Sequence, residues 1–179
     1  MTRYVLSVDG GGIRGIIPAI ILAEIQKRLT NFNKSLPEVF DLMAGTSTGG
    51  IIVAGLSKKN SQNEFEYSSM DLFQFYKNYG PYIFKPSFFR QEILYWFNGA
   101  KYSYKNIEFV LNKYFGEDTM GHASTNILFT SYDIHNNCPF FFKSWKDPNI
   151  TLKDALRSTT AAPTYFIPKC LKINKKIEF

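Results

Sequence analysis

Two glycine-rich motifs, each placed between an apolar stretch and a helix-forming stretch, constrain the fold of this chain more than any other feature. Asp-Gly-Gly-Gly-Ile-Arg-Gly occupies residues 9–15, and Gly-Thr-Ser-Thr-Gly-Gly occupies residues 45–50. The residues before each motif are typical of a buried strand, and those after it show helical periodicity. A strand, a glycine-rich turn and a helix, occurring twice in succession, indicate a parallel sheet with helices on its faces.

The rest of the chain extends this α/β pattern. We expect strands at residues 4–8, 40–44, 127–132 and 140–145, with a last strand or its approach at 169–179. We expect helices at residues 16–29, 51–58, 70–79, 88–97, 104–115 and 152–162, and a polar loop at 31–36. Pro81 and Pro86 predict a break after the third of these helices. The first helix is expected to pack on the sheet through its apolar positions, which are Ile17, Ile20, Ile21, Ile25 and Leu29.

Length and composition fit one globular domain. The 179 residues are 45% hydrophobic, and the two cysteines are too few for a disulfide framework. The start of the chain lacks a signal-peptide pattern, which together with the cysteine count favours a cytoplasmic location. A net charge of +6 is compatible with peripheral contact to an anionic membrane. Nucleic acid is not an expected partner, because no recognised binding module accompanies the charge.

The first motif has the features of an anion cradle. Without side chains, the successive N–H groups of Gly10, Gly11 and Gly12 can converge on a phosphate or a developing oxyanion. The following helix N-terminus and the charge of Arg14 favour the same ligand. The alternatives are a tight turn without a ligand, with Asp9 as its cap, and a dinucleotide site. We reject the dinucleotide site, since no second strand with an acidic residue follows at the required distance of about 20 residues.

The second motif predicts a nucleophile elbow. Gly45, Ser47 and Gly49 match G-x-S-x-G, and the motif lies between a predicted strand and a predicted helix. Such a turn is strained and requires small residues on either side of the serine, which then projects above the sheet. The alternative is an ordinary glycine-rich loop. Because loops that follow parallel strands open at the same edge of a sheet, we expect the cradle and Ser47 to face one site.

Both motifs resemble those of the patatin-like phospholipases. The likeness continues through Tyr-Ile-Phe at residues 82–84, the stretch 102–116, Thr-Ser-Tyr-Asp-Ile at 130–134 and Thr-Ala-Ala-Pro-Thr-Tyr-Phe at 160–166. It implies a three-layer α/β/α fold and a serine esterase that cleaves the acyl esters of phospholipids or related lipids. The nucleophile would be Ser47, acting in a Ser–Asp dyad. Gly10, Gly11 and Gly12 would form the oxyanion hole, Arg14 would support it, and no metal or cofactor would be needed.

The chain departs from the family pattern in its catalytic aspartate. In the family this residue opens an Asp-Gly-Gly or Asp-Gly-Ala motif after the Ala-Ala-Pro helix, and residues 1–179 contain no such motif beyond the cradle. The resemblance therefore implies a single patatin-like domain that is incomplete at its C-terminal end and poor in ester hydrolysis as given. His122, His135, Asp133 and Glu178 are weaker candidates for the base.

Two functions from different classes remain open. The first is a lipid acyl hydrolase. The second is a catalytically inactive lipid-binding or regulatory protein that keeps the cradle but lacks the base. The aromatic stretch at residues 88–97 is expected to be a buried helix, with a lipid-facing lid as the alternative.

Overall fold

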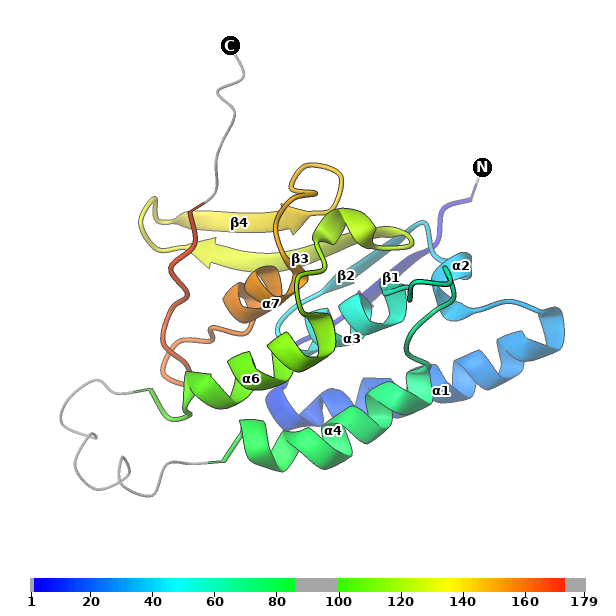
Figure 1. The fold of residues 1–179 in the computed structure, drawn as a ribbon, viewed down its shortest axis with the longest axis horizontal. Coiled ribbons are helices and arrows are strands. Elements are labelled where there is room, and N and C mark those ends of the chain that lie inside the picture. The colour runs from blue at the N-terminus through cyan, green and yellow to red at the C-terminus, as the bar shows by residue number, and fades with distance from the viewer. Residues whose placement is uncertain (1, 86–99, 173–179) are drawn as a thin grey trace, which may run out of the picture.

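The chain folds around a mainly parallel sheet (Figure 1). The computed structural model describes residues 2–85 and 100–172, and its strands are β1 (Val5–Val8), β2 (Leu42–Gly45), β3 (Asn126–Asp133) and β4 (Cys138–Lys143). The strand order is β1-β2-β3-β4. The first three strands run parallel, and β4 returns antiparallel to β3 through a hairpin turn. The expected α/β fold with a mainly parallel sheet is confirmed.

Most of the expected helices form close to their predicted positions. The helices are α1 (Ile16–Leu29), α2 (Leu36–Val39), α3 (Thr48–Ser57), α4 (Ser69–Ile83), α6 (Tyr104–Phe115) and α7 (Leu152–Thr159). The sequence did not predict α2, which starts with a capping box formed by Ser35 and Glu38. The predicted helix at 88–97 lies outside the described residues, and so does most of the predicted last strand. Residues 169–172 have no regular structure.

The predicted break at residues 81–86 begins a few residues later than Pro81. Pro81 lies inside α4, which continues to Ile83. A proline within a helix lacks the N–H that would bond to the carbonyl four residues earlier, here that of Lys77, and its ring crowds that carbonyl. Here only the last turn follows it, and the amide of Phe84 still bonds to the carbonyl of Gly80 at 3.0 Å. The helix therefore tolerates the proline and ends just after it.

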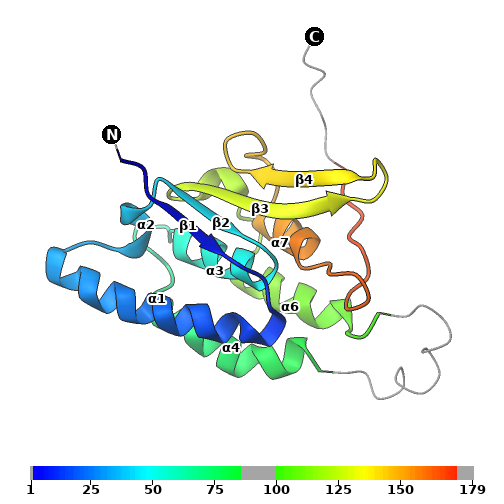
Figure 2. The ribbon, with the colours of Figure 1, turned by 180° about the vertical axis from the view of Figure 1, so that it is seen from behind.

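Helices cover one face of the sheet. The strand register aligns Val8, Gly45, Phe129 and Phe142 across the four strands, and the side chains of the valine and the two phenylalanines are buried on the face that the helices cover. Figures 1 and 2 show α3 and α7 on this face, and α3 is buried over its whole length. Helices α6 and α4 pack behind them, and α1 packs on α4. Of the three layers expected, the described residues form the sheet and one helical layer.

The first helix does not pack on the sheet as predicted. It buries Ala19 and Leu22, packs on α4 and lies beyond the β1 edge of the sheet (Figure 2). The isoleucine face of α1, comprising Ile17, Ile20, Ile21 and Ile25, is 40–56% exposed. Helical periodicity predicts that an apolar face exists, but it does not say which element covers that face.

Candidate active site

Ser47 occupies a strained turn between β2 and α3. Its backbone angles are φ 54° and ψ −120°, a conformation that residues other than glycine rarely adopt. Ser47 is also the N-cap residue of α3, so the positive end of the helix dipole lies beside it. The backbone at this position has the geometry expected of a nucleophile elbow.

The two glycines that flank the serine are sterically required. A Cβ atom on Gly45 would lie 2.5 Å from the backbone of Gly49. A Cβ atom on Gly49 would lie only 2.0 Å from the carbonyl oxygen of Val8 in β1. Neither contact can be relieved by rotating a side chain, because both involve backbone atoms. The small residues that the motif predicts are thus needed so that α3 can start directly against β1 and β2.

The glycine cradle and the serine elbow meet, as their spacing predicts. A Cβ atom on Gly10 would lie 3.0 Å from both the Cβ of Ser47 and the carbonyl oxygen of Thr46. The amide of Gly11 donates to the hydroxyl of Thr48 at 3.1 Å, which ties the cradle to the first turn of α3. The two motifs therefore form one site at the carboxyl edge of the parallel strands.

The three cradle glycines differ in their hydrogen bonds. The amide of Gly11 is occupied by Thr48, whereas Gly10 and Gly12 donate their N–H groups to no other described residue. Gly12 has a positive φ of 58°, which a residue with a side chain would adopt only with strain. Arg14 folds back on the turn and donates from its backbone N and its Nε to the carbonyl of Gly11, at 3.1 and 3.3 Å. It thus braces the turn from an exposed position.

Thr159, the last residue of α7, anchors the elbow and was not predicted from the sequence. The amide of Ser47 donates to the buried hydroxyl of Thr159, at the end of α7, at 2.9 Å. On the other side of the turn, the hydroxyls of Thr46 and Thr130 lie 2.7 Å apart and share a hydrogen bond. No local pattern indicates these pairs, because they join residues that are distant in sequence.

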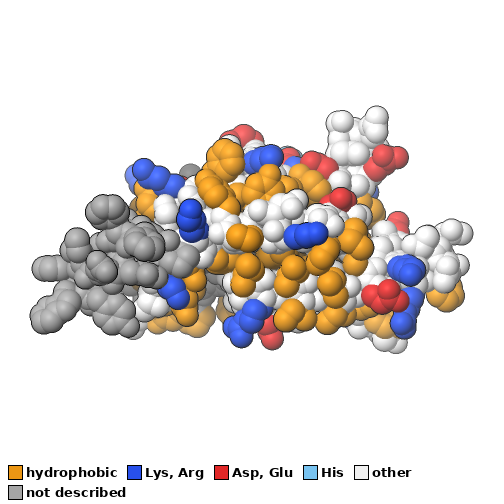
Figure 3. Space-filling view, turned by 90° about the horizontal axis from the view of Figure 1, so that it is seen from below, with side chains coloured by type: hydrophobic (Ala, Val, Ile, Leu, Met, Phe, Trp, Pro, Cys, Tyr) orange, Lys and Arg blue, Asp and Glu red, His pale blue; other side chains and the backbone are white. Residues whose placement is uncertain are grey.

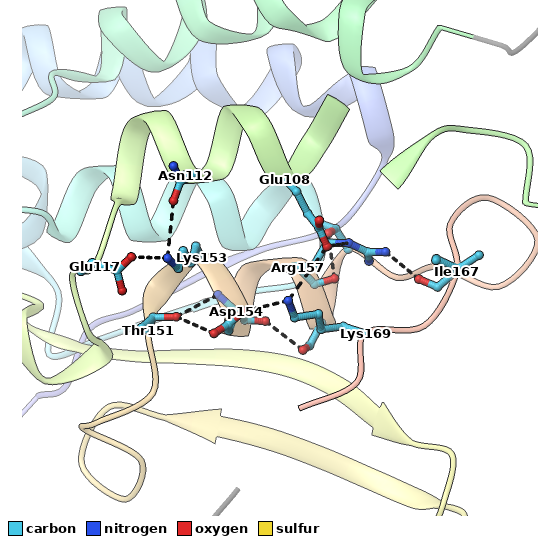
Figure 4. A network of polar contacts seen from close by, with 11 residues as sticks. Glu108, Asn112, Glu117, Thr151, Lys153, Asp154, Arg157, Ile167 and Lys169 are labelled. Atoms are coloured by element: carbon cyan, nitrogen blue, oxygen red, sulfur yellow. Dashed lines mark hydrogen bonds and ion pairs between the residues drawn. The ribbon is translucent and has the colours of Figure 1, made fainter. Parts of the chain in front are cut away.

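A polar network holds α7 in place (Figure 4). Arg157 is 2% exposed, donates to the carbonyl of Ile167 at 2.7 Å and pairs with Glu108 of α6 at 3.4 Å. Lys169 pairs with Asp154 at 3.0 Å. The network links α6, α7 and the segment after α7, and so fixes the helix that supplies Thr159.

Tyr76 of α4 supports the start of α3. Its hydroxyl donates to the carbonyl of Thr48 at 2.6 Å, and its ring fills the space that a side chain at Gly15 would need. Complete burial raises the pKa of Tyr76 above its usual range, so this hydroxyl remains a neutral donor. The start of α3 and the turn after the cradle are therefore both fixed by α4.

The other candidate bases have different roles. Asp133 accepts the amides of His135 and Asn136 at 2.9 and 3.1 Å, and its hydrogen bond to the Asn136 side chain lowers its pKa. Since Phe129 pairs with Gly45, Asp133 lies four residues, about 13 Å, further along β3. His122 accepts the amide of Thr119 at 3.4 Å. Asp133, His135 and His122 form no hydrogen bond with Ser47. Glu178 lies outside the described residues.

The described residues contain neither a cluster of metal ligands nor a helix that could span a membrane. Within residues 2–85 and 100–172, no group of three or more histidine, cysteine, aspartate or glutamate side chains is placed to hold a metal ion. None of the helices in the described part of the chain combines the length and the apolar character needed to cross a membrane.

Known proteins are similar in sequence to this chain over nearly its whole length. The family model described as patatin-like phospholipase matches residues 6–177. Patatin-05 of Solanum tuberosum is 38% identical over 179 residues, which cover 95% of this chain and 45% of that protein. Patatin-17 of Solanum cardiophyllum is 40% identical over 173 residues, covering 92% and 43%. The crystal structure of the type III effector protein ExoU is 15% identical with a TM-score of 0.46, covering 90% of this chain and 40% of that one. The chain spans less than half the length of these patatins.

Proposed function

Because the chain belongs to the patatin-like phospholipase family, we propose that it forms part of a lipid acyl hydrolase whose nucleophile is Ser47. The observation that carries this proposal is the strained elbow of Ser47 in contact with Gly10 of the cradle. Strain at a solvent-accessible serine beside unpaired backbone donors is costly, and it is typical of sites that perform acyl transfer. The substrate would be a phospholipid or another acyl lipid, reached by peripheral contact with a lipid surface in the cytoplasm.

The proposed reaction has two steps. The Oγ of Ser47 attacks the ester carbonyl and passes its proton to a base, and the alcohol leaves with a proton to give an acyl-enzyme. The N–H groups of Gly10 and Gly12 stabilise the oxyanion, while Gly11 holds the cradle against α3. Water then releases the fatty acid. No described residue bonds to Ser47 Oγ as a base, so the proposal requires the family's aspartate to come from outside residues 1–179.

Covalent labelling tests the assignment of the nucleophile. We expect a fluorophosphonate probe to modify Ser47 selectively, although slowly, because no residue in the described part of the chain is placed to act as its base. The modified residue would be located by mass spectrometry. Ser47→Ala should abolish the labelling, whereas Ser61→Ala, which alters an exposed serine in a loop, should leave it unchanged.

Two results would contradict the proposal. The first is equal labelling of Ser47 and Ser61. The second is ester hydrolysis that survives Ser47→Ala. Binding of phospholipid vesicles without any labelling of Ser47 would instead support a catalytically inactive lipid-binding protein.

A further inference from the structure

Arg157 of α7 is the largest fully buried side chain among the described residues, and it carries a charge. It is 2% exposed, whereas Arg3, Arg14 and Arg28, the other arginines that the structure describes, are exposed. Figure 3, which shows the face formed by α1 and α4, has the lysine and arginine side chains of that face at the surface. Arginine is seldom buried unless partners compensate its charge, so the contacts of Arg157 must explain its position.

The partners of Arg157 satisfy its guanidinium only in part. Its Nη2 donates to the carbonyl of Ile167 at 2.7 Å, and its Nε lies 3.4 Å from the carboxylate of Glu108. Nε and Nη1 form no hydrogen bond within residues 2–85 and 100–172. Burial lowers the pKa of Arg157, although the carboxylate of Glu108 acts in the opposite direction. Because a buried ion pair often adds no stability over apolar residues of the same size, stability does not account for this arginine.

Arg157 fixes the end of α7, where Thr159 supports the elbow. Its contact with Glu108 joins α7 to α6, and its bond to Ile167 joins α7 to the segment that follows it (Figure 4). Thr159 lies two residues further along the same helix, and its hydroxyl accepts the amide of Ser47 at 2.9 Å. A shift of α7 relative to α6 would therefore move the anchor of the elbow.

A chain of packed aromatic rings leads from Arg157 to the cradle. The guanidinium carbon lies 5.8 Å from the centre of the Phe166 ring. Phe166 meets Phe84, at the end of α4, with 6.4 Å between the two ring centres. The Phe84 ring lies 3.6 Å from the place that a Cβ atom on Gly12 would take. Gly12 is one of the two cradle residues whose N–H groups donate to no other described residue, so this chain of contacts ends at a candidate oxyanion donor.

Arg157 is therefore connected to both parts of the candidate active site. We propose that Arg157 is a positioning residue, which holds the Ser47 elbow and Gly12 of the cradle at the distance that acyl transfer requires. Its planar guanidinium contacts three partners at once, which neither the point charge of a lysine nor an apolar side chain can do. An oxyanion donor acts only within hydrogen-bond distance of the oxyanion, so a small shift of either part slows acylation. This effect on catalysis rests on the proposed function, whereas the effect on the elbow does not.

Replacement by methionine tests this role, because methionine is similar in length but has neither charge nor donors. We expect Arg157→Met to keep its Tm within about 4 °C of the parent, since apolar replacement of a buried ion pair costs little. Labelling of Ser47 by the fluorophosphonate probe should nevertheless slow about tenfold. In the same variant, NMR should show about tenfold faster amide hydrogen exchange at Ser47 in the native state, as the bond to Thr159 loosens.

Two further variants separate the contacts. Arg28→Met removes an exposed arginine that pairs with Glu24 at 3.2 Å, and it should change neither the labelling nor the exchange. Phe166→Leu removes the ring contact and leaves the hydrogen bond between Ser47 and Thr159 in place. It should therefore slow the labelling without changing the exchange at Ser47.

Arg157→Lys keeps the charge without the planar guanidinium, so its labelling rate should lie between those of Arg157→Met and the parent. It carries the same comparison if Arg157→Met does not fold. Labelling that falls only in proportion to the loss of folded protein would overturn the proposal, because it would show a purely structural role. Unchanged labelling in Arg157→Met or in Phe166→Leu would also overturn it. If the parent is not labelled at Ser47 while the exchange there still responds to Arg157→Met, the proposed function is contradicted and the positioning of the elbow stands.

Discussion

A hydrogen atom is the largest side chain that the surroundings of Gly49 allow. The carbonyl oxygen of Val8 would lie 2.0 Å from a Cβ atom at this position, so a larger residue forces β1 and α3 apart. Gly11 offers a contrast, because its nearest contact would be the Cβ of Arg14 at 3.4 Å and its φ is 179°. The same substitution at these two glycines therefore tests whether the close approach of Val8 makes glycine necessary at position 49.

Gly49→Ala should destabilise the protein strongly. We expect a loss of about 3 kcal/mol, at the upper end of overpacking costs, or about 6–12 °C in Tm for a chain of this size. Gly11→Ala should change Tm by less than about 2 °C, because the nearest contact of the added methyl group would be at 3.4 Å. Thermal unfolding of the two variants and the parent protein measures these changes in Tm. Equal Tm values for the two variants would contradict the steric argument.

Thr159 acts on the elbow only through the amide of Ser47. Thr159→Val keeps the shape of the side chain but removes the acceptor, which leaves a strained N–H unpaired at a cost of about 1–3 kcal/mol. We expect Ser47 labelling to fall about tenfold as the turn relaxes. Thr160→Val is the control, since the buried hydroxyl of Thr160 bonds to helix carbonyls rather than to the elbow. If both variants label alike, Thr159 has no positioning role.

At the scale of single elements, the bounds of a strand or helix can be predicted from the sequence where short runs of neighbouring residues specify them. The strand at β1 and the helix at α1 were predicted with nearly their observed bounds, because a β-branched run before glycines and a helical repeat with an early proline are both local features. The packing of α1 was predicted wrongly. Its partner is α4, and nothing in the sequence of α1 distinguishes α4 from a sheet.

The start of α4 has a strong local signal that a mutation can test. The hydroxyl of Ser68 accepts the amide of Asp71 at 3.1 Å, and the Asp71 carboxylate accepts the amide of Ser68 at 2.8 Å. Ser68→Ala should cost about 1 kcal/mol, or about 2–4 °C in Tm. Ser61→Ala, in a nearby loop, should leave Tm unchanged. A Tm for Ser68→Ala within 1 °C of the parent would show that packing alone fixes this end of α4.

At the scale of the whole molecule, net charge predicts how the protein meets a lipid surface. The chain carries a net charge of +6, and each basic residue near an anionic surface contributes about 1 kcal/mol. We expect sedimentation with phosphatidylserine-containing vesicles at 0.1 M salt, and little at 1 M, where the screening length falls to about 3 Å. Equally strong binding to neutral and to anionic vesicles would contradict an electrostatic contact.

The sequence by itself determined the parts that depend on neighbours along the chain. The glycines at 45 and 49 and the serine between them specify the elbow, since a sharp turn is a property of a few consecutive residues. The spacing of the two motifs also determined that cradle and elbow meet, because two parallel strands joined by a helix bring their loops to one edge. Only the tertiary structure decided that Thr159 holds Ser47 and that α1 packs on α4. These depend on which surfaces come together across long stretches of chain, and hydrophobic patterning does not specify the partner of an apolar face.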